Sequence, residues 1–133
     1  YMGHGGPDRL AHEGLLTLDD VSALNNADRL PVVTTLTCLT GRFAIPGHDC
    51  LGEALVLHPS GGAIAFWGPS GLLLNRQSKA LGQEFLRGVL GPGERVLGDA
   101  ILEAHRASAG QGSATLDLYN LLGDPGLKLR RGE

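Results

Sequence analysis

The chain has 133 residues, 42% of them hydrophobic, with a mean hydropathy of +0.02 and a formal net charge of −3 at pH 7. These values predict one globular domain over residues 1–133 with enough apolar residues for a core, and they exclude a large nucleic-acid surface, which needs clustered Lys and Arg. No apolar run approaches the ~20 residues of a membrane helix, and two cysteines are too few for a disulfide scaffold.

The first half of the chain contains two segments in which glycine follows a reactive side chain, Gly5 after His4 and Gly41 after Cys38. Gly3-His4-Gly5-Gly6 comes first, and a short helix is expected after Asp19-Asp20, with an acidic residue as its N-cap. The β-branched run 31–38 follows a proline and ends in Cys38, which is typical of a buried strand.

The second half alternates helices with strands. The patterns predict, in order, a helix over 51–57 capped by Asp49, a strand over 62–67, a helix around Leu81 to Leu90, a helix from about 95 to 110, and a last short strand near 127–129. This alternation predicts a parallel sheet covered on both faces. Because the sheet would be thin and the chain begins abruptly at Tyr1-Met2-Gly3, we expect further strands on its amino-terminal side.

His4 and Cys38 are the candidate reactive pair. If each ends a neighbouring parallel strand, the two side chains meet at the carboxyl edge of the sheet, where α/β folds place their sites. A thiolate attacks an amide when a neighbouring imidazolium or dipole favours it, and His4 can protonate the departing amine. Gly5 suits a backbone donor to the oxyanion, because it lets substrate approach closely.

Each candidate also has a purely structural interpretation. Cys38 alone could be an inert core thiol, and Cys50 is expected to be buried, although a Cys38–Cys50 disulfide is open in an oxidising compartment. Asp19 or Asp20 could orient His4, but helix capping is favoured. His48-Asp49-Cys50 is a poor metal site because adjacent residues seldom converge on one ion, so no metal is predicted.

Trp67 and the segment 119–125 lie outside the candidate reactive pair. Trp67 either walls a substrate pocket or covers the core, with equal weight. Tyr119-Asn120 before Gly123-Asp124-Pro125 predicts a structural corner, in which Asp124 binds nearby backbone and Pro125 ends a helix.

Taken together, these segments resemble the carboxyl-terminal half of a gingipain-type cysteine peptidase domain, in the wider group that includes caspases and legumain. The resemblance rests on Gly3-His4-Gly5, Leu18-Asp19-Asp20, Leu30-Pro31-Val32-Val33, Thr37-Cys38-Leu39-Thr40-Gly41-Arg42-Phe43, Gly52-Glu53-Ala54-Leu55, Gly61-Gly62-Ala63-Ile64-Ala65 and Tyr119-Asn120-Leu121-Leu122-Gly123-Asp124-Pro125. It implies a three-layer α/β/α caspase-like sandwich with a mostly parallel sheet that lacks its amino-terminal strands here. It also adds the amide of Cys38 to that of Gly5 as an oxyanion donor.

The function expected from the residues and the resemblance is a cysteine endopeptidase with Cys38 as nucleophile and His4 as general acid/base. No cofactor is needed for that chemistry. The alternatives are a non-catalytic relative and a transpeptidase, serving in protein secretion or cell-surface assembly. The resemblance implies a secreted or cell-envelope location and a protein or peptide substrate. The expected open edge of the sheet implies association with the missing amino-terminal part of the domain or with a second copy.

Overall fold

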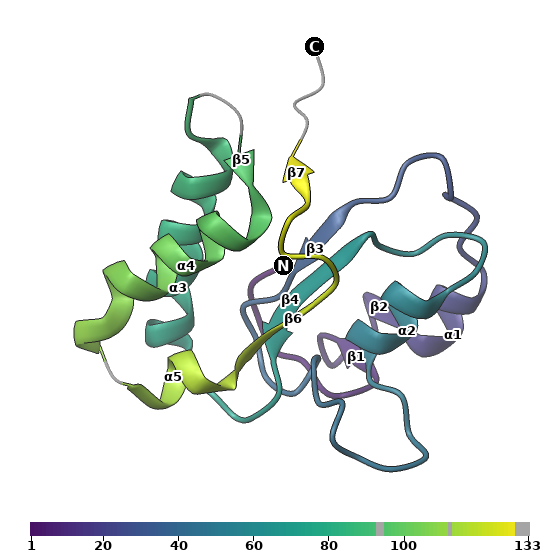
Figure 1. Cartoon of the computed structure of the whole chain (residues 1–133). Coiled ribbons are helices and arrows are strands. Elements are labelled where there is room, and N and C mark those ends of the chain that lie inside the picture. The colour runs from purple at the N-terminus through teal and green to yellow at the C-terminus, as the bar shows by residue number, and fades with distance from the viewer. Residues whose placement is uncertain (93–94, 112, 130–133) are drawn as a thin grey trace.

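A computed structural model describes residues 1–92, 95–111 and 113–129 (Figure 1). The elements follow in the order β1 (Arg9–Leu10), β2 (Leu16–Thr17), α1 (Leu18–Ser22), β3 (Val32–Thr34), α2 (Leu51–Leu57), β4 (Ala65–Pro69), α3 (Asn75–Leu90), β5 (Arg95–Val96), α4 (Leu97–Ser108), the 3-10 helix η1 (Ala109–Gln111), α5 (Ser113–Leu118), β6 (Tyr119–Leu122) and β7 (Lys128–Leu129). None of the helices in these ranges has the length and apolar character to cross a membrane.

The central sheet has the strand order β3-β4-β6. β3 pairs with β4 in parallel, with Val32 opposite Ala65, whereas β6 runs antiparallel to β4, with Tyr119 opposite Pro69. The first residues of the chain extend this sheet, because Met2 forms a parallel bridge with Leu36 just beyond β3. The pairs β1-β2 and β5-β7 form separate two-stranded antiparallel sheets.

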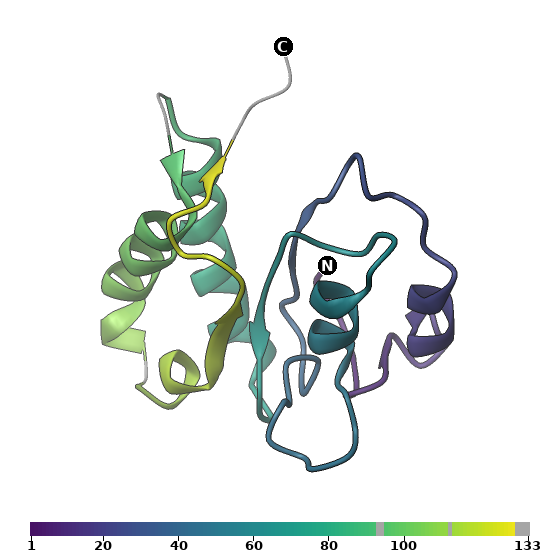
Figure 2. The ribbon, with the colours of Figure 1, turned by 45° about the vertical axis from the view of Figure 1, so that its right-hand side comes forward.

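Two hydrophobic cores lie on opposite faces of β4, because successive strand residues point to opposite sides. Ala65 and Trp67 belong to the core that includes residues of α3 and α4, whereas Phe66 belongs to the core that includes residues of α1 and α2. Figures 1 and 2 both show α3 and α4 on one side of the sheet and α1 and α2 on the other. The sheet is therefore held between two groups of helices.

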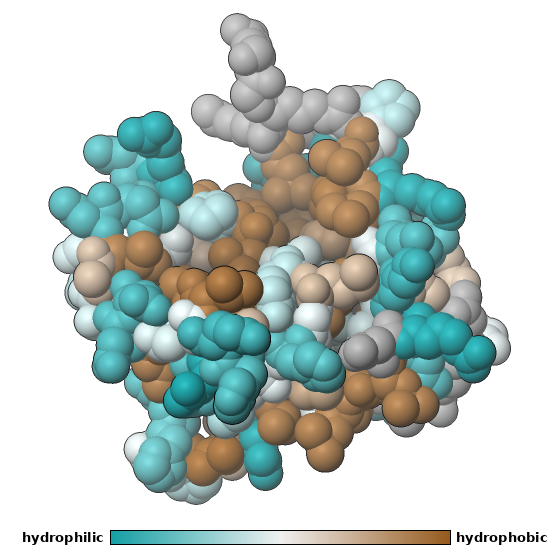
Figure 3. Space-filling model, turned by 180° about the vertical axis from the view of Figure 1, so that it is seen from behind, coloured by the Kyte–Doolittle hydropathy of each residue, from teal (hydrophilic) through white to brown (hydrophobic). Residues whose placement is uncertain are grey.

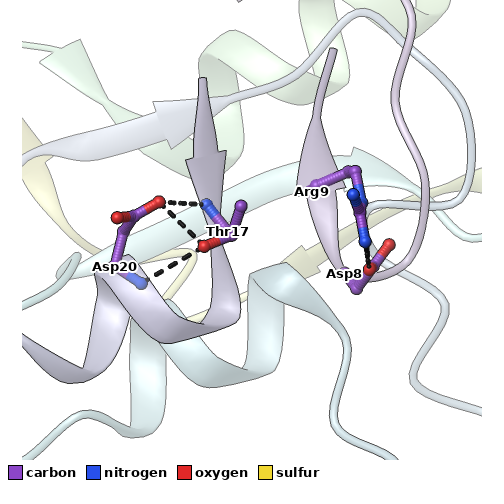
Figure 4. A network of polar contacts seen from close by, with 4 residues as sticks. All are labelled: Asp8, Arg9, Thr17 and Asp20. Atoms are coloured by element: carbon purple, nitrogen blue, oxygen red, sulfur yellow. Dashed lines mark hydrogen bonds and ion pairs between the residues drawn. The ribbon is translucent and has the colours of Figure 1, made fainter. Parts of the chain in front are cut away.

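The predicted helices are present, but two of their caps were wrong. Thr17, not Asp19 or Asp20, is the N-cap of α1, and Asp20 accepts hydrogen bonds from Thr17 to complete a capping box (Figure 4). Cys50, not Asp49, occupies the N-cap position of α2, where its N–H donates to the Glu53 carboxylate at 2.9 Å. In both helices the main-chain N–H of the N-cap residue donates to the carboxylate of the residue three positions later, and this bond determines where the helix begins.

The sheet also differs from the prediction. Its three strands are mixed, so the mostly parallel three-layer sandwich is not confirmed, and β7 pairs with β5 outside the central sheet. Tyr119 begins the antiparallel strand β6, because α5 already ends at Leu118, so the prediction that Pro125 ends a helix was wrong. Asp124 does bind nearby backbone as predicted, since its carboxylate accepts the Gly126 N–H at 2.7 Å.

Candidate active site

The segments that carry His4 and Cys38 lie side by side. The Leu36 N–H donates to the Tyr1 carbonyl at 2.7 Å, and the Gly3 N–H donates to the Leu36 carbonyl at 3.3 Å. His4 and Cys38 each follow the bridged pair Met2 and Leu36 by two residues, so both come at the same carboxyl edge. His4 is exposed and Cys38 is half-buried.

Gly5 packs directly against the segment that contains Cys38. A Cβ atom at position 5 would lie 2.6 Å from Oγ1 of Thr37 and 3.2 Å from Cγ2 of Thr40. Real Cβ atoms do not approach that closely, so only glycine fits without movement of Thr37. The absence of a side chain at Gly5 thus lets the two segments meet.

Cys38 precedes a strained turn. Leu39 has a φ of 62°, in the left-handed region that a Leu side chain rarely adopts. The turn is held to the end of β4 and the chain just after it, because the Gly41 N–H donates to the Pro69 carbonyl at 2.9 Å and the Leu39 N–H to the Gly71 carbonyl at 3.2 Å. Such strain persists only where the surroundings hold it, and it is concentrated at functional sites.

The Cys38 thiol lies against the main chain of Leu73. The Leu73 N–H donates to Sγ at 3.5 Å, and Sγ lies 3.6 Å from the Leu73 carbonyl oxygen as a donor. The thiol therefore has a main-chain donor and a main-chain acceptor beside it.

The backbone of His4 is held in a tight hairpin. Its carbonyl accepts the Ala11 N–H at 2.8 Å and the Tyr1 hydroxyl at 2.9 Å, and Gly5 is bridged to Leu10. Ala11 closes the hairpin with a φ of 59°, a second left-handed residue that is not glycine. The position of His4 is thus determined by main-chain contacts.

The other cysteine has a different environment. Cys50 is 1% exposed, and burial raises the pKa of its thiol to about 11. This confirms the prediction that Cys50 is a buried packing residue. Both cysteines are free thiols, so the Cys38–Cys50 disulfide is not formed. Within the described ranges, no three His, Cys, Asp or Glu side chains gather in a way that could hold a metal.

Trp67 has no exposed surface. Its ring lies 4.5 Å from that of Phe85 and 4.9 Å from that of Tyr119, between centroids. This placement favours the core role over the pocket wall, the two alternatives that the sequence left equal. The reason is strand alternation, which turns Trp67 toward α3 and α4.

Sequence reasoning missed three neighbours of the site, Leu73, Thr37 and Thr40. Leu73 contacts the thiol through its main chain, and such a contact has no signature in the sequence. Thr37 and Thr40 hold Gly5, and the recurrence of threonine through 34–40 was a signal that could have found them.

The sequence model of Peptidase family C25 matches residues 1–130. The chain belongs to this family. A search of curated proteins found no match. Among solved structures, the chain is similar to the Arg-specific cysteine proteinase gingipain R (RgpB), with a TM-score of 0.81 and 21% identity over 98% of this chain and 32% of that one. It is also similar to a complex of the Porphyromonas gingivalis RgpB pro- and mature domains, with a TM-score of 0.85 and 20% identity over 96% and 32% of the two chains.

These likenesses show that this C25 chain has an α/β fold like that of the gingipain structures. A third structure, described as a protease, has a TM-score of 0.72 and 18% identity over 94% of this chain and 33% of that one. The chain spans about a third of the length of the solved proteins that it matches. The prediction of a gingipain-type family is confirmed.

Proposed function

We propose that this chain supplies the nucleophile and the general acid/base of a cysteine endopeptidase, Cys38 and His4. The observation that supports this most directly is the shared register of the two segments, in which each residue follows the Met2–Leu36 bridge by two positions. Membership of a peptidase family agrees with it.

In the proposed reaction, Cys38 Sγ attacks the carbonyl carbon of the scissile peptide bond. His4 takes the thiol proton and passes it to the departing amine nitrogen as the C–N bond breaks. A water from which His4 removes a proton then attacks the acyl carbon of the thioester, the C–S bond breaks and the acyl half leaves as a carboxylic acid. His4 returns the proton to sulfur, which restores the thiol.

The main-chain N–H groups of Gly5 and Cys38 are the proposed oxyanion donors. Neither N–H makes a hydrogen bond with any part of the chain that the structure describes, so both are available to a substrate oxygen. Donors of this kind stabilise charge that develops in the transition state, and the loss of one costs about 10²–10³ in kcat.

The test uses the full-length protein and a peptide library with mass spectrometry of the products. Cys38→Ala and His4→Ala should each abolish cleavage, whereas Cys50→Ala, which removes the buried thiol, should leave the cleavage pattern unchanged. A wild-type protein that cleaves nothing, or a Cys38→Ala variant that still cleaves, would refute the proposal. Products joined to an added amine would instead identify the transpeptidase alternative.

We further propose that the domain over residues 1–133 is completed by other sequence of the same protein, which pairs with the outer edge of residues 1–3. Tyr1 and Met2 are 38% and 59% exposed, and with Leu36 and Leu86 they line a mostly apolar hollow of about 280 Å³. Further exposed hydrophobic residues include Leu72, Leu74 and Leu90. Figure 3 shows hydrophobic residues at the surface of the rear face of the molecule.

The solved relatives are about three times as long as this chain, which supports a covering segment from the same polypeptide over a second copy. Coexpression with the rest of the full-length protein should give a 1:1 complex more stable than the chain alone, and a homodimer would refute this partner. A secreted or cell-envelope location is proposed on the resemblance alone, and detection of the mature protein in culture medium or envelope fractions tests it.

A further inference from the structure

A hollow of about 310 Å³ lies beside His4, within the hairpin that this residue begins. His4 itself forms part of the wall, and Asp8, Arg9, Ala11 and His12 of the same hairpin form much of the rest. This volume is in the range of small-ligand sites. The hollow therefore has room for one or two side chains of a peptide.

The hairpin holds the wall of this hollow in a defined shape. The Gly6 N–H donates to the Arg9 carbonyl at 3.0 Å, and the Ala11 N–H to the His4 carbonyl at 2.8 Å. Ala11 adopts its left-handed φ of 59° at the closing position. Strain of this kind is expected where the backbone holds side chains in place for binding.

The polar part of the wall is an ion pair between adjacent residues. Arg9 donates to one oxygen of the Asp8 carboxylate through Nη2 at 2.6 Å and Nε at 3.0 Å (Figure 4). The side chains of Arg9 and Asp8 remain 48% and 44% exposed, so both are accessible to a molecule that enters the hollow. Because the two charges cancel, the wall offers a donor and an acceptor without net charge.

The direction of the proposed reaction determines which part of a substrate meets this wall. His4 must reach the nitrogen of the departing amine, so the peptide beyond the scissile bond leaves on the side of His4. The acyl half lies on the side of Cys38 and Leu73. The hollow lined by His4 is therefore on the leaving-group side.

We infer that this hollow is a subsite for the residues that follow the scissile bond, and that the Asp8–Arg9 pair selects uncharged polar side chains there. This inference rests on the proposed function. A Gln or Asn side chain can donate to Asp8 and accept from Arg9 while their ion pair stays intact. A Lys side chain is attracted by Asp8 but repelled by Arg9, and a Glu side chain is attracted by Arg9 but repelled by Asp8. Each therefore gains less binding energy than Gln or Asn.

The test uses the full-length protein and internally quenched peptides that differ only at the two positions after the scissile bond, occupied by Gln, Glu or Lys. For the wild type, kcat/KM should be highest for Gln. Arg9→Gln leaves the Asp8 carboxylate unpaired and should raise the ratio of kcat/KM for Lys over Glu about fivefold, whereas Asp8→Asn should lower it by a similar factor.

Glu84 and Arg87 of α3 provide matched controls. They form another exposed ion pair, so Glu84→Gln and Arg87→Gln remove the same kinds of charge at a different surface. For both control variants, the ratio of kcat/KM for the Lys peptide over the Glu peptide should equal that of the wild type. Mass spectrometry of the products ensures that every variant is compared at the same bond.

The outcomes separate the subsite from the reaction. If the wild type cleaves the peptides but Asp8→Asn and Arg9→Gln leave the ratio unchanged, or shift it in the same direction, the subsite is refuted and the peptidase stands. If the wild type cleaves none of the peptides of any composition, the proposed function fails and the subsite fails with it.

Discussion

Gly5→Ala tests whether the His4 and Cys38 segments depend on a contact that only glycine allows. The added Cβ would lie 2.6 Å from Thr37 Oγ1 and 3.0 Å from Thr37 Cγ2, and Thr37 is 1% exposed, so it has little room to move. Overpacking of this kind costs about 1–3 kcal/mol. The φ of Gly5 is not in the left-handed region, so the cost comes from packing and not from the backbone.

The assay is urea unfolding together with kcat/KM, both on the full-length protein. With a loss of about 2 kcal/mol and an m-value of about 2 kcal/mol/M, the midpoint should fall by about 1 M urea. Because Thr37 directly precedes Cys38, displacement of the segment by about 1 Å should also lower kcat/KM by about 10²-fold. Gly110→Ala is the control, since nothing lies within 4 Å of a Cβ there.

A second substitution tests whether contact with Thr37 causes the loss of stability in Gly5→Ala. Thr37→Ala removes the two nearest atoms that the new Cβ would meet and leaves only Thr40 Cγ2 at 3.2 Å, and Thr37 Oγ1 has no hydrogen-bond partner in the described part of the chain. The double variant Gly5→Ala/Thr37→Ala should therefore regain much of the stability and activity lost in Gly5→Ala. If Gly5→Ala matched Gly110→Ala in both measurements, the claim of close packing would be refuted.

The remaining predictions concern the reactivity of the two thiols and the N-cap of α1. Cys50 should be alkylated far more slowly than Cys38, because a pKa raised from 9.0 to about 11 lowers its thiolate fraction at neutral pH about 100-fold. His4→Ala should slow labelling at Cys38 only, as peptide mass spectrometry would show, and equal rates at both thiols would contradict this. Thr17→Ala should cost about 1 kcal/mol at pH 7. Hydrogen bonds from Thr17 lower the pKa of Asp20, so the part of the cap that depends on the Asp20 carboxylate is present above pH 3.8 and is lost as pH falls through the lower folded value. The bond from the Asp20 N–H to Thr17 Oγ1 remains in acid, so the urea midpoints of wild type and variant should come closer without becoming equal, and a constant gap would contradict the role of the carboxylate.

The helices were largely predictable from the sequence, for a local reason. Leu81 and Phe85 recur on one face of α3, and Ala100 and Ala104 on one face of α4, and all four are buried in one core. The caps were harder, because Thr17 and Cys50 are distinguished only by a reciprocal bond to Asp20 or Glu53.

The candidate site was predictable only as a pair of segments. Glycines around His4 and a β-branched run before Cys38 indicated two strand ends, and the family resemblance placed them in order. The Leu73 main chain at the Cys38 thiol could not be predicted, and the sequence left the core and pocket roles of Trp67 equal, because neither depends on residues near in sequence.

Local sequence patterns were enough to predict the helices, the approximate positions of β3 and β4 and the residue types available for thiol chemistry, since periodicity and local chemistry are carried by neighbouring residues. Long-range packing sets the antiparallel direction of β6, the Met2–Leu36 bridge and the fit of Gly5 against Thr37. These depend on contacts between residues more than thirty positions apart, and no local pattern specifies which distant segments will meet.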